Sequence, residues 1–261
     1  MDSFQAGSGL RLRTVPEWQT RWSRLVDRIR VVDGAADEVQ LLHELSNIDQ
    51  TCVVAFVNAH AMNCAAADSG FFDALMDAEV LLRDGSGMAH LYHRVGRPAG
   101  LNMNGTDFIP KLLAAAQGRR VAFWGTQEPY LSVAVGYAQL EWSANVVSAE
   151  HGFHGDEHYV QCANALQLDI AVLGMGMPKQ ERVALLVRQA SVKPMLVVCG
   201  GAIIDFMGGK ARRAPKWMRN VGLEWLYRLV LEPVRLFKRY IIGIPQFLFR
   251  LRQWSIARPR K

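Results

Sequence analysis

Two polar residues stand directly after apolar, β-branched runs, where a parallel sheet would gather ligand-binding side chains. Asn58 follows the run 52–57, and Asp84 follows the run 80–82 and precedes Gly85. An aspartate at a strand end beside glycine can present its carboxylate to a ligand and act as a general base. On spacing alone, an aspartate that caps a helix or a turn is the favoured interpretation, and the catalytic one is the alternative.

Glycine-rich loops follow three further β-branched runs. The glycines are Gly125 after 120–124, Gly174 and Gly176 after 169–173, and Gly200 and Gly201 after 195–198. Pro178, in the first turn of the next helical pattern, would leave backbone N–H groups free for a nucleotide diphosphate. A tight strand-to-helix turn is the alternative, because G-x-G alone is a weak signal and no G-x-G-x-x-G is present. Several such loops at strand ends, one of them leading to Asp205, indicate a nucleotide crevice.

Three histidines, His151, His154 and His158, lie among glycines and acidic residues, which raises the question of a metal site. The cluster lacks the two-histidine helix of an H-E-x-x-H motif, and its glycines predict a polar loop that lines the same crevice. The cysteines stand far apart without a C-x-x-C pair, which argues against zinc and against disulfides. We expect buried thiols in a reducing compartment, and neither a metal nor a cofactor. The cysteines are Cys52, Cys64, Cys162 and Cys199.

The elements that must position these residues alternate between β-branched runs and helical patterns. This alternation predicts an α/β fold with a Rossmann-like, largely parallel sheet and flanking helices, in which ligands bind outside the carboxyl ends of the strands. Half of the 261 residues are hydrophobic, which suffices for a buried core. The predicted strands are 29–32, 52–57, 80–82, 120–124, 145–148, 169–173 and 195–198. The predicted helices are 37–45, 60–76, 88–95, 106–117, 129–142, 156–166 and 178–189.

The last fifty residues carry the whole positive charge of the chain. Residues 212–261 hold thirteen lysines and arginines against Glu224 and Glu232, a local net charge of +11, whereas residues 1–211 hold seventeen against twenty-two, or −5. Aromatic residues alternate with these cations, as expected of a segment on an anionic membrane surface. A helical hairpin that packs its aromatics on the core is the alternative. The aromatics are Trp217, Trp225, Tyr227, Phe237, Tyr240, Phe247, Phe249 and Trp254.

This pattern divides the chain into three parts. We expect a flexible leader over residues 1–20, a catalytic core over 21–210 and a basic helical, membrane-associating appendage over 211–261. The longest uncharged run of the appendage, 240–249, is ten residues long, about half the length of a membrane-spanning helix. The start of the sequence has no secretory signal. The chain is therefore expected to stay in the cytoplasm and to lie on a membrane without crossing it.

Several motifs, taken together and in order, resemble one family. They are Asn104-Gly105-Thr106-Asp107-Phe108, Gly174-x-Gly176-x-Pro178-Lys179-Gln180-Glu181, Gly200-Gly201-x-x-x-Asp205-Phe206, Arg213-Ala214-Pro215, Gly222-Leu223-Glu224-Trp225-Leu226-x-Arg228-Leu229 and Glu232-Pro233-x-Arg235. Over about residues 28–245 the chain resembles the WecG/TagA/CpsF glycosyltransferases, family 26. The resemblance implies an inverting, metal-independent transfer of a sugar from a nucleotide-sugar to a polyprenyl-diphosphate-linked acceptor at the cytoplasmic membrane face. It also implies a Rossmann-like core of the type called GT-E with a C-terminal membrane-targeting appendage.

The resemblance also assigns roles to residues. It implies that Asp84 is the base, that Asn58 is the family's asparagine after the second strand, and that Arg228, Arg235 and Lys238 close over the donor diphosphate. On the acceptor side we expect Asn102 and Arg83. The other residues expected to bind the donor or its diphosphate are Asn104, Gly105, Gly125, Gly174, Gly176, Gln180, Glu181, Gly201 and Asp205.

Two positions depart from the teichoic-acid members of the family. Phe56 stands where those members have threonine, and Asn102 stands where they have arginine. The N-acetylmannosamine donor of that branch is therefore not assumed, and a glucosyl donor, as in the GumM-like exopolysaccharide branch, is the expectation. The expected partners are a UDP-sugar, a polyprenyl-diphosphate-linked saccharide and an anionic membrane surface, with no nucleic acid. Self-association into a homo-oligomer is left open.

Two other classes of function stay in view. A non-catalytic, nucleotide-binding subunit of a membrane-associated polysaccharide assembly complex would share the crevice and the appendage, although Asp84 argues for catalysis. An NAD-dependent sugar oxidoreductase would share only the alternating pattern. The chain lacks the glycine fingerprint of that class and its acidic residue about twenty positions further on.

Overall fold

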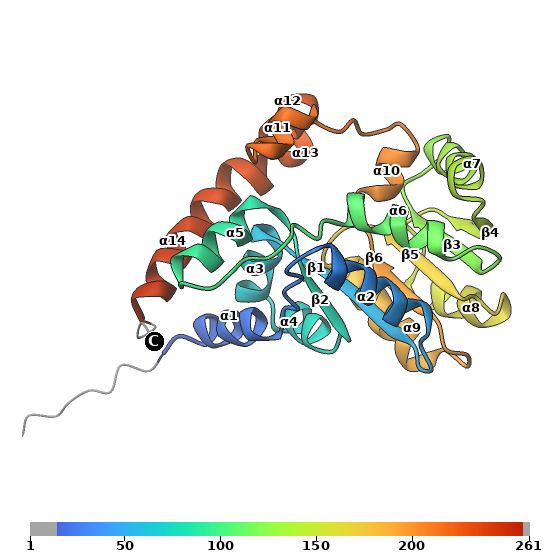
Figure 1. Ribbon diagram of the computed structural model, residues 1–261, viewed down its shortest axis with the longest axis horizontal. Helices are drawn as coiled ribbons and strands as arrows, with labels where there is room; N and C mark the ends of the chain where they lie inside the picture. The colour runs from blue at the N-terminus through green and yellow to red at the C-terminus, as the bar shows by residue number, and fades with distance from the viewer. Residues whose placement is uncertain (1–14, 258–261) are drawn as a thin grey trace, which may run out of the picture.

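The computed structural model of the chain describes residues 15–257 and forms one six-stranded sheet in which every strand pair is parallel (Figure 1). The strand order is β2-β1-β6-β5-β3-β4. The chain builds one edge first, crosses to the other, and fills the centre last, so the sheet has a crossover point where ligands bind in such folds. The strands are β1 (Cys52–Val57), β2 (Val80–Arg83), β3 (Arg120–Gly125), β4 (Asn145–Glu150), β5 (Ile170–Gly174) and β6 (Leu196–Cys199).

Helices cover both faces of the sheet, and the alternation of side chains along β1 feeds both cores. Val53, Ala55 and Val57 join one hydrophobic cluster, whereas Val54 and Phe56 join the other. The first face is covered by α1 (Glu17–Arg28), α3 (Ala59–Ala67), α4 (Ser69–Met76), α5 (Gly85–Arg94), α8 (Asp156–Ala165) and α9 (Lys179–Ala190). The second is covered by α2 (Ala35–Ser46), α6 (Gly105–Ala115), α7 (Tyr130–Trp142) and α10 (Ile203–Met207). The predicted Rossmann-like α/β class is confirmed.

The strand predicted at 29–32 is wrong. These residues make only an isolated bridge between Arg30 and Leu82. The segment is too short to pair further, because α1 ends at Arg28 and the carbonyl of Val32 accepts a hydrogen bond from the backbone N–H of Leu101 at 2.7 Å. An apolar run of four residues is thus a connector beside β2.

The helix predicted over 60–76 is two helices, α3 and α4. Asp68 separates them, and its carboxylate accepts a hydrogen bond from the backbone N–H of Phe71 at 3.1 Å. An aspartate satisfies free N–H groups at a helix start better than it continues a helix, so the chain begins a new helix there. Of the predicted leader, residues 17–20 belong to α1, and residues 1–14 lie outside the described part of the chain.

The basic tail is helical and returns to the core. It comprises α11 (Lys216–Asn220), α12 (Glu224–Leu231), α13 (Pro233–Phe237), a π-helical turn η1 (Lys238–Ile242) and α14 (Gly243–Ala257). Figure 1 shows α11, α12 and α13 apart from the sheet, and α14 running back toward α1. Phe247, Leu251 and Trp254 of α14 are buried in the same cluster as Trp22 of α1. Two of the tail's aromatics are therefore core residues, as the hairpin interpretation expected.

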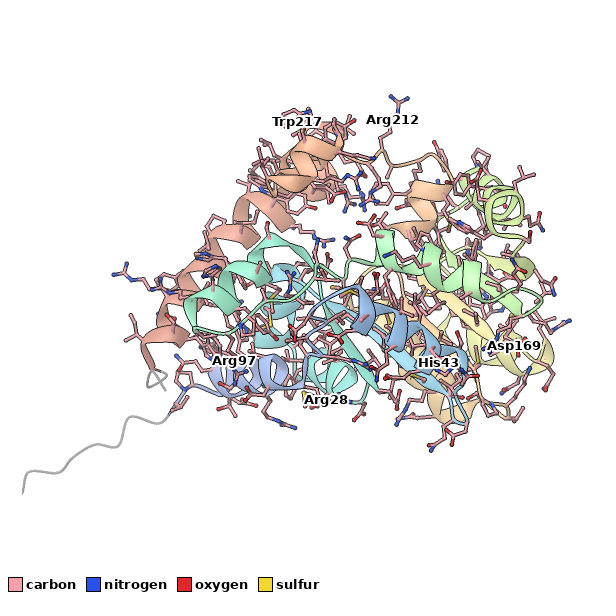
Figure 2. The ribbon with its side chains drawn as sticks, in the orientation of Figure 1. Arg28, His43, Arg97, Asp169, Arg212 and Trp217 are labelled. Carbon is pink, nitrogen blue, oxygen red and sulfur yellow. The ribbon has the colours of Figure 1, made fainter. Side chains whose placement is uncertain are left out.

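The remaining aromatics of the tail are not buried in this way. Trp217 and Phe249 are 64% and 63% exposed. Figure 2 shows Trp217 and Arg212 at the top of the view, near the start of the tail, pointing away from the body of the molecule. Within residues 15–257, no helix combines the length and the apolar character that crossing a membrane requires.

Candidate active site

A cavity of about 280 Å³ lies at the carboxyl ends of the strands and is closed on its other side by the tail. Residues that follow β1, β2, β3, β5 and β6 line it together with residues of α12, α13 and η1. Of the residues expected from the sequence, the cavity is lined by Asn58, Asp84, Asn104, Gly105, Gly174, Gly176, Gln180, Gly201, Asp205, Arg228 and Arg235. Arg83, Asn102, Gly125, Glu181 and Lys238 are not among its lining residues.

Asp84 stands at the N-cap position of α5, yet its side chain makes no capping hydrogen bond. Instead, the side-chain amide of Asn58 donates to the Oδ2 atom of Asp84 at 3.1 Å. Asn58 is itself fixed, because its Oδ1 atom accepts hydrogen bonds from the backbone N–H groups of His60 and Ala61 at the start of α3. The residue after a neighbouring strand thus holds the carboxylate of Asp84 in the cavity. The cap interpretation explains why Asp84 stands at the start of α5, but its side chain does not cap that helix.

Arg83 and Asn102 support the loop behind Asp84. The buried guanidinium of Arg83 donates to the carbonyls of Ala99, Gly85 and Gly100 at 2.7 to 3.1 Å. The Oδ1 atom of Asn102 accepts a hydrogen bond from the backbone N–H of Gly85 at 2.7 Å. These contacts fix the backbone on both sides of Asp84, and a direct contact of either side chain with an acceptor stays a prediction.

Two glycine loops meet beneath the cavity through one buried side chain. The Oε1 atom of Gln180 accepts hydrogen bonds from the backbone N–H groups of Gly176 and Gly201, both at 3.2 Å. Gly125 is needed for a different reason, because a Cβ atom there would lie 2.5 Å from the backbone of Gly174. The predicted glycines are therefore brought together, and Gln180 joins the loops after β5 and β6 into one unit.

Glu181 is buried beneath these loops rather than in the cavity wall. Its Oε1 atom accepts a hydrogen bond from the Nε2 atom of Gln180 at 2.8 Å, whereas its Oε2 atom has no hydrogen-bond partner among the described residues. Burial raises the pKa of Glu181 to about 7, despite the opposing hydrogen bond from Gln180 and the charge of Arg239.

Asn104 and Asp107 attach the start of the tail to the core. Asn104 caps α6, since its Oδ1 atom accepts from the backbone N–H of Asp107 at 3.0 Å and its amide donates to the Asp107 carboxylate at 2.8 Å. The same carboxylate pairs with the guanidinium of Arg213. Burial would raise the pKa of Asp107, but the hydrogen bonds from Arg213 and Asn104 bring it below its ordinary value. The Asn-Gly-Thr-Asp motif thus holds the Arg-Ala-Pro motif in place.

Cations dominate the wall that the tail contributes. Arg228 lies over the ring of Phe206 at 5.4 Å, and its buried Nε atom has no hydrogen-bond partner among the described residues. Arg235 pairs with Glu232 at 2.5 Å. From the core side, Lys210 lies 3.4 Å from an oxygen of Asp205 and donates to the hydroxyl of Thr126. All three cations line the cavity.

Arg239 lies in the cavity wall beside the position expected from the sequence, Lys238. Arg239 lines the cavity, whereas Lys238 is exposed at the start of the π-helical turn. Burial and the charge of Arg239 together lower the pKa of the nearby His60 to about 4, so the imidazole stays neutral beside the cationic wall. Spacing alone does not decide between the two, because Lys238 and Arg239 follow Arg235 by three and four residues and both would lie on one face of a regular helix.

The histidine loop contributes to the cavity through other residues. Gly152 and Phe153 line it, and the histidines on either side do not. The Nζ atom of Lys179 donates to the carbonyls of Gly152 and His154 at 2.9 and 2.7 Å and so ties this loop to the start of α9.

Comparison with known proteins identifies a family for the chain. A family model described as the glycosyl transferase WecG/TagA/CpsF family matches residues 26–261. A relative from Bacillus subtilis (strain 168), N-acetylglucosaminyldiphosphoundecaprenol N-acetyl-beta-D-mannosaminyltransferase, is 28% identical over 207 residues, which cover 77% of this chain and 79% of the relative. Since the match to the family spans most of the sequence, the chain belongs to the WecG/TagA/CpsF family of glycosyltransferases.

Proposed function

We propose that this protein transfers a hexosyl group from a UDP-sugar to a polyprenyl-diphosphate-linked saccharide, with inversion at the anomeric carbon. One observation carries the proposal. The carboxylate of Asp84, which Asn58 orients, lies in the same cavity as the arginines of the tail. A base on one wall and cations on the other are the two groups that a direct displacement of a nucleoside diphosphate requires.

In the proposed reaction, Asp84 takes the proton of the acceptor hydroxyl group. The hydroxyl oxygen then forms a bond to the anomeric carbon as the bond between that carbon and the diphosphate oxygen breaks. The leaving UDP takes the electron pair of that bond, so one displacement inverts the configuration. Asn58 holds the carboxylate in place, since its amide donates to one oxygen and leaves the other available to the acceptor.

Cations of the cavity supply the charge that the leaving diphosphate requires. The cations that line the cavity are Arg228, Arg235, Arg239 and Lys210. One guanidinium group can bind two phosphate oxygens at once. We therefore propose that the transfer proceeds without Mg²⁺ or Mn²⁺ at the diphosphate.

We also propose that the protein lies on the cytoplasmic face of the cell membrane, where it reaches its lipid-linked acceptor. The tail exposes large apolar side chains beside its cations, among them Trp217, Val234, Phe237 and Phe249. Each cation near an anionic surface contributes about 1 kcal/mol, and salt screens this attraction. Sedimentation with vesicles that contain phosphatidylglycerol should therefore fall as salt rises, with phosphatidylcholine vesicles as the control. Equal binding to both vesicle types, independent of salt concentration, would contradict an electrostatic attraction between the tail and anionic lipid.

For the donor, we propose glucose as the sugar and exopolysaccharide synthesis as the context. Phe56 supports a donor unlike N-acetylmannosamine, because it brings an aromatic ring to the cavity wall, with the ring of Phe108 6.5 Å away. The relative from Bacillus subtilis is named for an N-acetylmannosaminyl donor and an N-acetylglucosaminyl-diphospho-undecaprenol acceptor, so both of these belong in the test.

The test is a panel of UDP-sugars with polyprenyl-diphosphate mono- and disaccharides as acceptors, in buffer without divalent cations. We expect acceptor-dependent release of UDP, greatest with UDP-glucose, and no stimulation by Mg²⁺ or Mn²⁺. Preference for UDP-N-acetylmannosamine would overturn the donor, and a requirement for Mn²⁺ would overturn the role of the cations. Absence of acceptor-dependent UDP release with every donor would favour a non-catalytic subunit.

A further inference from the structure

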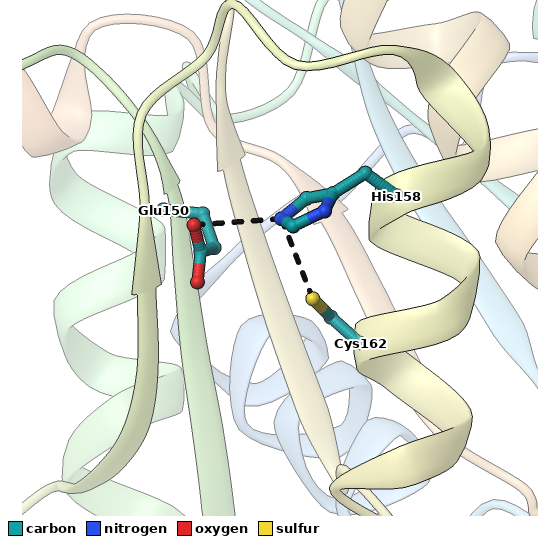
Figure 3. Close-up of side chains that lie close together, drawn as sticks. All are labelled: Glu150, His158 and Cys162. Carbon is teal, nitrogen blue, oxygen red and sulfur yellow. Dashed lines mark hydrogen bonds and ion pairs between the residues drawn. The ribbon is translucent and has the colours of Figure 1, made fainter.

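Three side chains of metal-ligating type converge beside the cavity, where β4 ends and α8 begins (Figure 3). An oxygen of Glu150 lies 3.4 Å from the Nε2 atom of His158, and the same nitrogen lies 3.5 Å from the Sγ atom of Cys162. A ligand atom from each of the three residues falls within 4.8 Å of the others, and no second group of this kind occurs between residues 15 and 257. The three are half-buried, so an ion could reach them.

These separations match the edges of a tetrahedral zinc site. With Zn–N and Zn–O bonds of about 2.0–2.1 Å, two such ligands around one tetrahedral ion stand about 3.3 Å apart, and a nitrogen and a thiolate sulfur stand about 3.6 Å apart. The distances from His158 to Glu150 and to Cys162 agree with these two edges to within about 0.1 Å.

A fourth potential ligand lies next to the three. The Nε2 atom of His154 is 3.2 Å from the same Glu150 oxygen, and the rings of His154 and His158 stack with centroids 4.0 Å apart. His154, His158 and Cys162 follow one another at intervals of four, which places them along one side of α8 and the turn before it. A carboxylate, imidazole and thiolate set is one that zinc prefers over Mg²⁺ or Ca²⁺.

We propose that Glu150, His158 and Cys162 form a zinc site, with His154 or a water molecule as the fourth ligand. The site is separate from the proposed transfer chemistry, because none of the four side chains lines the cavity. It would connect the end of β4 to α8 across the loop that carries Gly152 and Phe153, which do line the cavity. Zinc would then stabilise a wall of the donor site without contacting the donor.

The sequence alone pointed away from this site. The three histidines by themselves do not form a metal-binding helix motif, and Cys162 has no cysteine near it in the sequence. Only the fold brings the glutamate at the end of β4 to the imidazole and thiol on α8.

The test measures zinc bound by the full chain without an affinity tag, after dialysis against a defined concentration of free Zn²⁺. We expect one zinc per chain, and in Cys162→Ser or His158→Gln an affinity lower by more than the roughly 10- to 100-fold that loss of an outer-shell partner costs. Replacement by Co²⁺ should give a thiolate-to-metal charge-transfer absorption that Cys162→Ser lacks. His154→Gln should lower the affinity less than His158→Gln does, because a water molecule can take the fourth position.

The chain offers a matched control in its other histidine–cysteine pair. Cys64 lies four residues after His60 on α3, and the sulfur is 3.6 Å from the imidazole. Among residues 15–257, however, no carboxylate completes a group of three with them. Cys64→Ser should therefore leave the bound zinc unchanged. Less than one zinc per chain at saturation, equal binding by wild type and Cys162→Ser, or a cobalt complex without a thiolate band would each overturn the proposal. None of these readouts depends on the proposed transferase activity.

Discussion

Two helices of the basic tail have similar compositions and opposite environments. α12 combines Trp225 and Tyr227 with Arg228 and has no buried residue. In contrast, α14 carries Arg250 and Arg252 and buries two of its three aromatics, Phe247 and Trp254. The first covers the cavity and contributes a cation to it. The second packs on α3, and its Phe247 and Trp254 contact Trp22 of α1. An aromatic and cationic composition therefore does not separate a helix that covers the cavity from one that anchors the tail to the core. Changes to the two helices should have different consequences.

The contacts of α14, the anchor of the tail, also determine where α12, the cover of the cavity, lies. The carbonyl of Gly243, at the start of α14, accepts a hydrogen bond from the side-chain amide of Asn63 at 2.7 Å. The guanidinium of Arg250 donates to the Oδ1 atom of the same asparagine at 3.0 Å. Together with the pair between Asp107 and Arg213, these contacts fix both ends of the segment that carries the cavity arginines. Removal of all residues after Gly209 should therefore expose the core around Trp22 and leave the remainder aggregated rather than soluble.

The largest effect on activity should come from the core wall that α12 faces. Asp84→Asn keeps the hydrogen-bonding shape but cannot take a proton, so turnover should fall roughly 100- to 10,000-fold, the range for a positioned base. Folding, vesicle binding and donor binding should be unchanged. Asp73→Asn, an exposed aspartate on α4, is the control, and a measured turnover near that of wild type in Asp84→Asn would remove Asp84 from the mechanism.

Changes to the buried residues of the anchor should lower the stability of the fold rather than turnover. Trp254→Ala removes a buried ring that packs on Trp22 at 6.0 Å and donates to the hydroxyl of Ser23, so the free energy of unfolding should fall by about 3–5 kcal/mol. Phe249→Ala, at an exposed position on the same helix, should change it by less than about 0.5 kcal/mol. Urea unfolding measures both. Equal losses in the two variants would mean that α14 does not anchor the tail.

Changes to the cations beside the cover should lower turnover and leave the stability of the fold unchanged. The double variant Arg228→Ala with Arg235→Ala removes two cations from the cavity wall, and turnover should fall on the order of 100-fold, comparable to the loss of one preorganised charge-stabilising donor. Vesicle binding should stay close to that of wild type, because many other residues of the tail are cationic. Arg252→Ala, exposed on α14, is the control. If the double variant lost vesicle binding but kept its turnover on a short soluble acceptor, Arg228 and Arg235 would serve membrane binding and not the leaving diphosphate.

The smallest expected effect concerns the buried acid beneath the core wall. Because burial raises the pKa of Glu181 from 4.5 to about 7, the folded chain binds this proton more tightly than the unfolded chain does. The free energy of unfolding should therefore fall as the pH rises from about 4.5 to about 7, and the contribution should be constant above that range. Glu181→Gln should lose this dependence, a change on the order of 2 kcal/mol between pH 5 and pH 8. Exposed Glu157→Gln is the control, and the same pH dependence in Glu181→Gln and wild type would contradict the raised pKa.

The sequence predicted the sheet well because buried parallel strands are uninterrupted apolar runs. Each of β1 to β6 lies within one or two residues of its predicted range, and the residues after β1 and β2, Asn58 and Asp84, meet because parallel strands end at the same edge. Helix phase was harder to predict. A π-helical turn decides whether Lys238 or Arg239 faces the cavity, and no local propensity indicates such a turn.

The long-range contacts were beyond the sequence for a related reason. Trp254 is equally suited to a bilayer surface and to a protein core, and only the apolar face of α1 decides between them. The proximity of Glu150 to Cys162 depends in the same way on the angle at which α8 packs against β4. Such choices are made by tertiary packing and not by composition.

The contact between Trp22 and Trp254 also bears on how the protein is made. The hydrogen bond from Trp254 to Ser23 joins residues 231 positions apart in the chain, so during synthesis the first helix emerges from the ribosome long before its partner exists. Part of the Trp22 surface must stay uncovered until α14 has been translated, an interval in which exposed apolar surface favours aggregation and chaperone binding. Completion of the tail therefore ends the exposure of the first helix and closes the cavity in the same event.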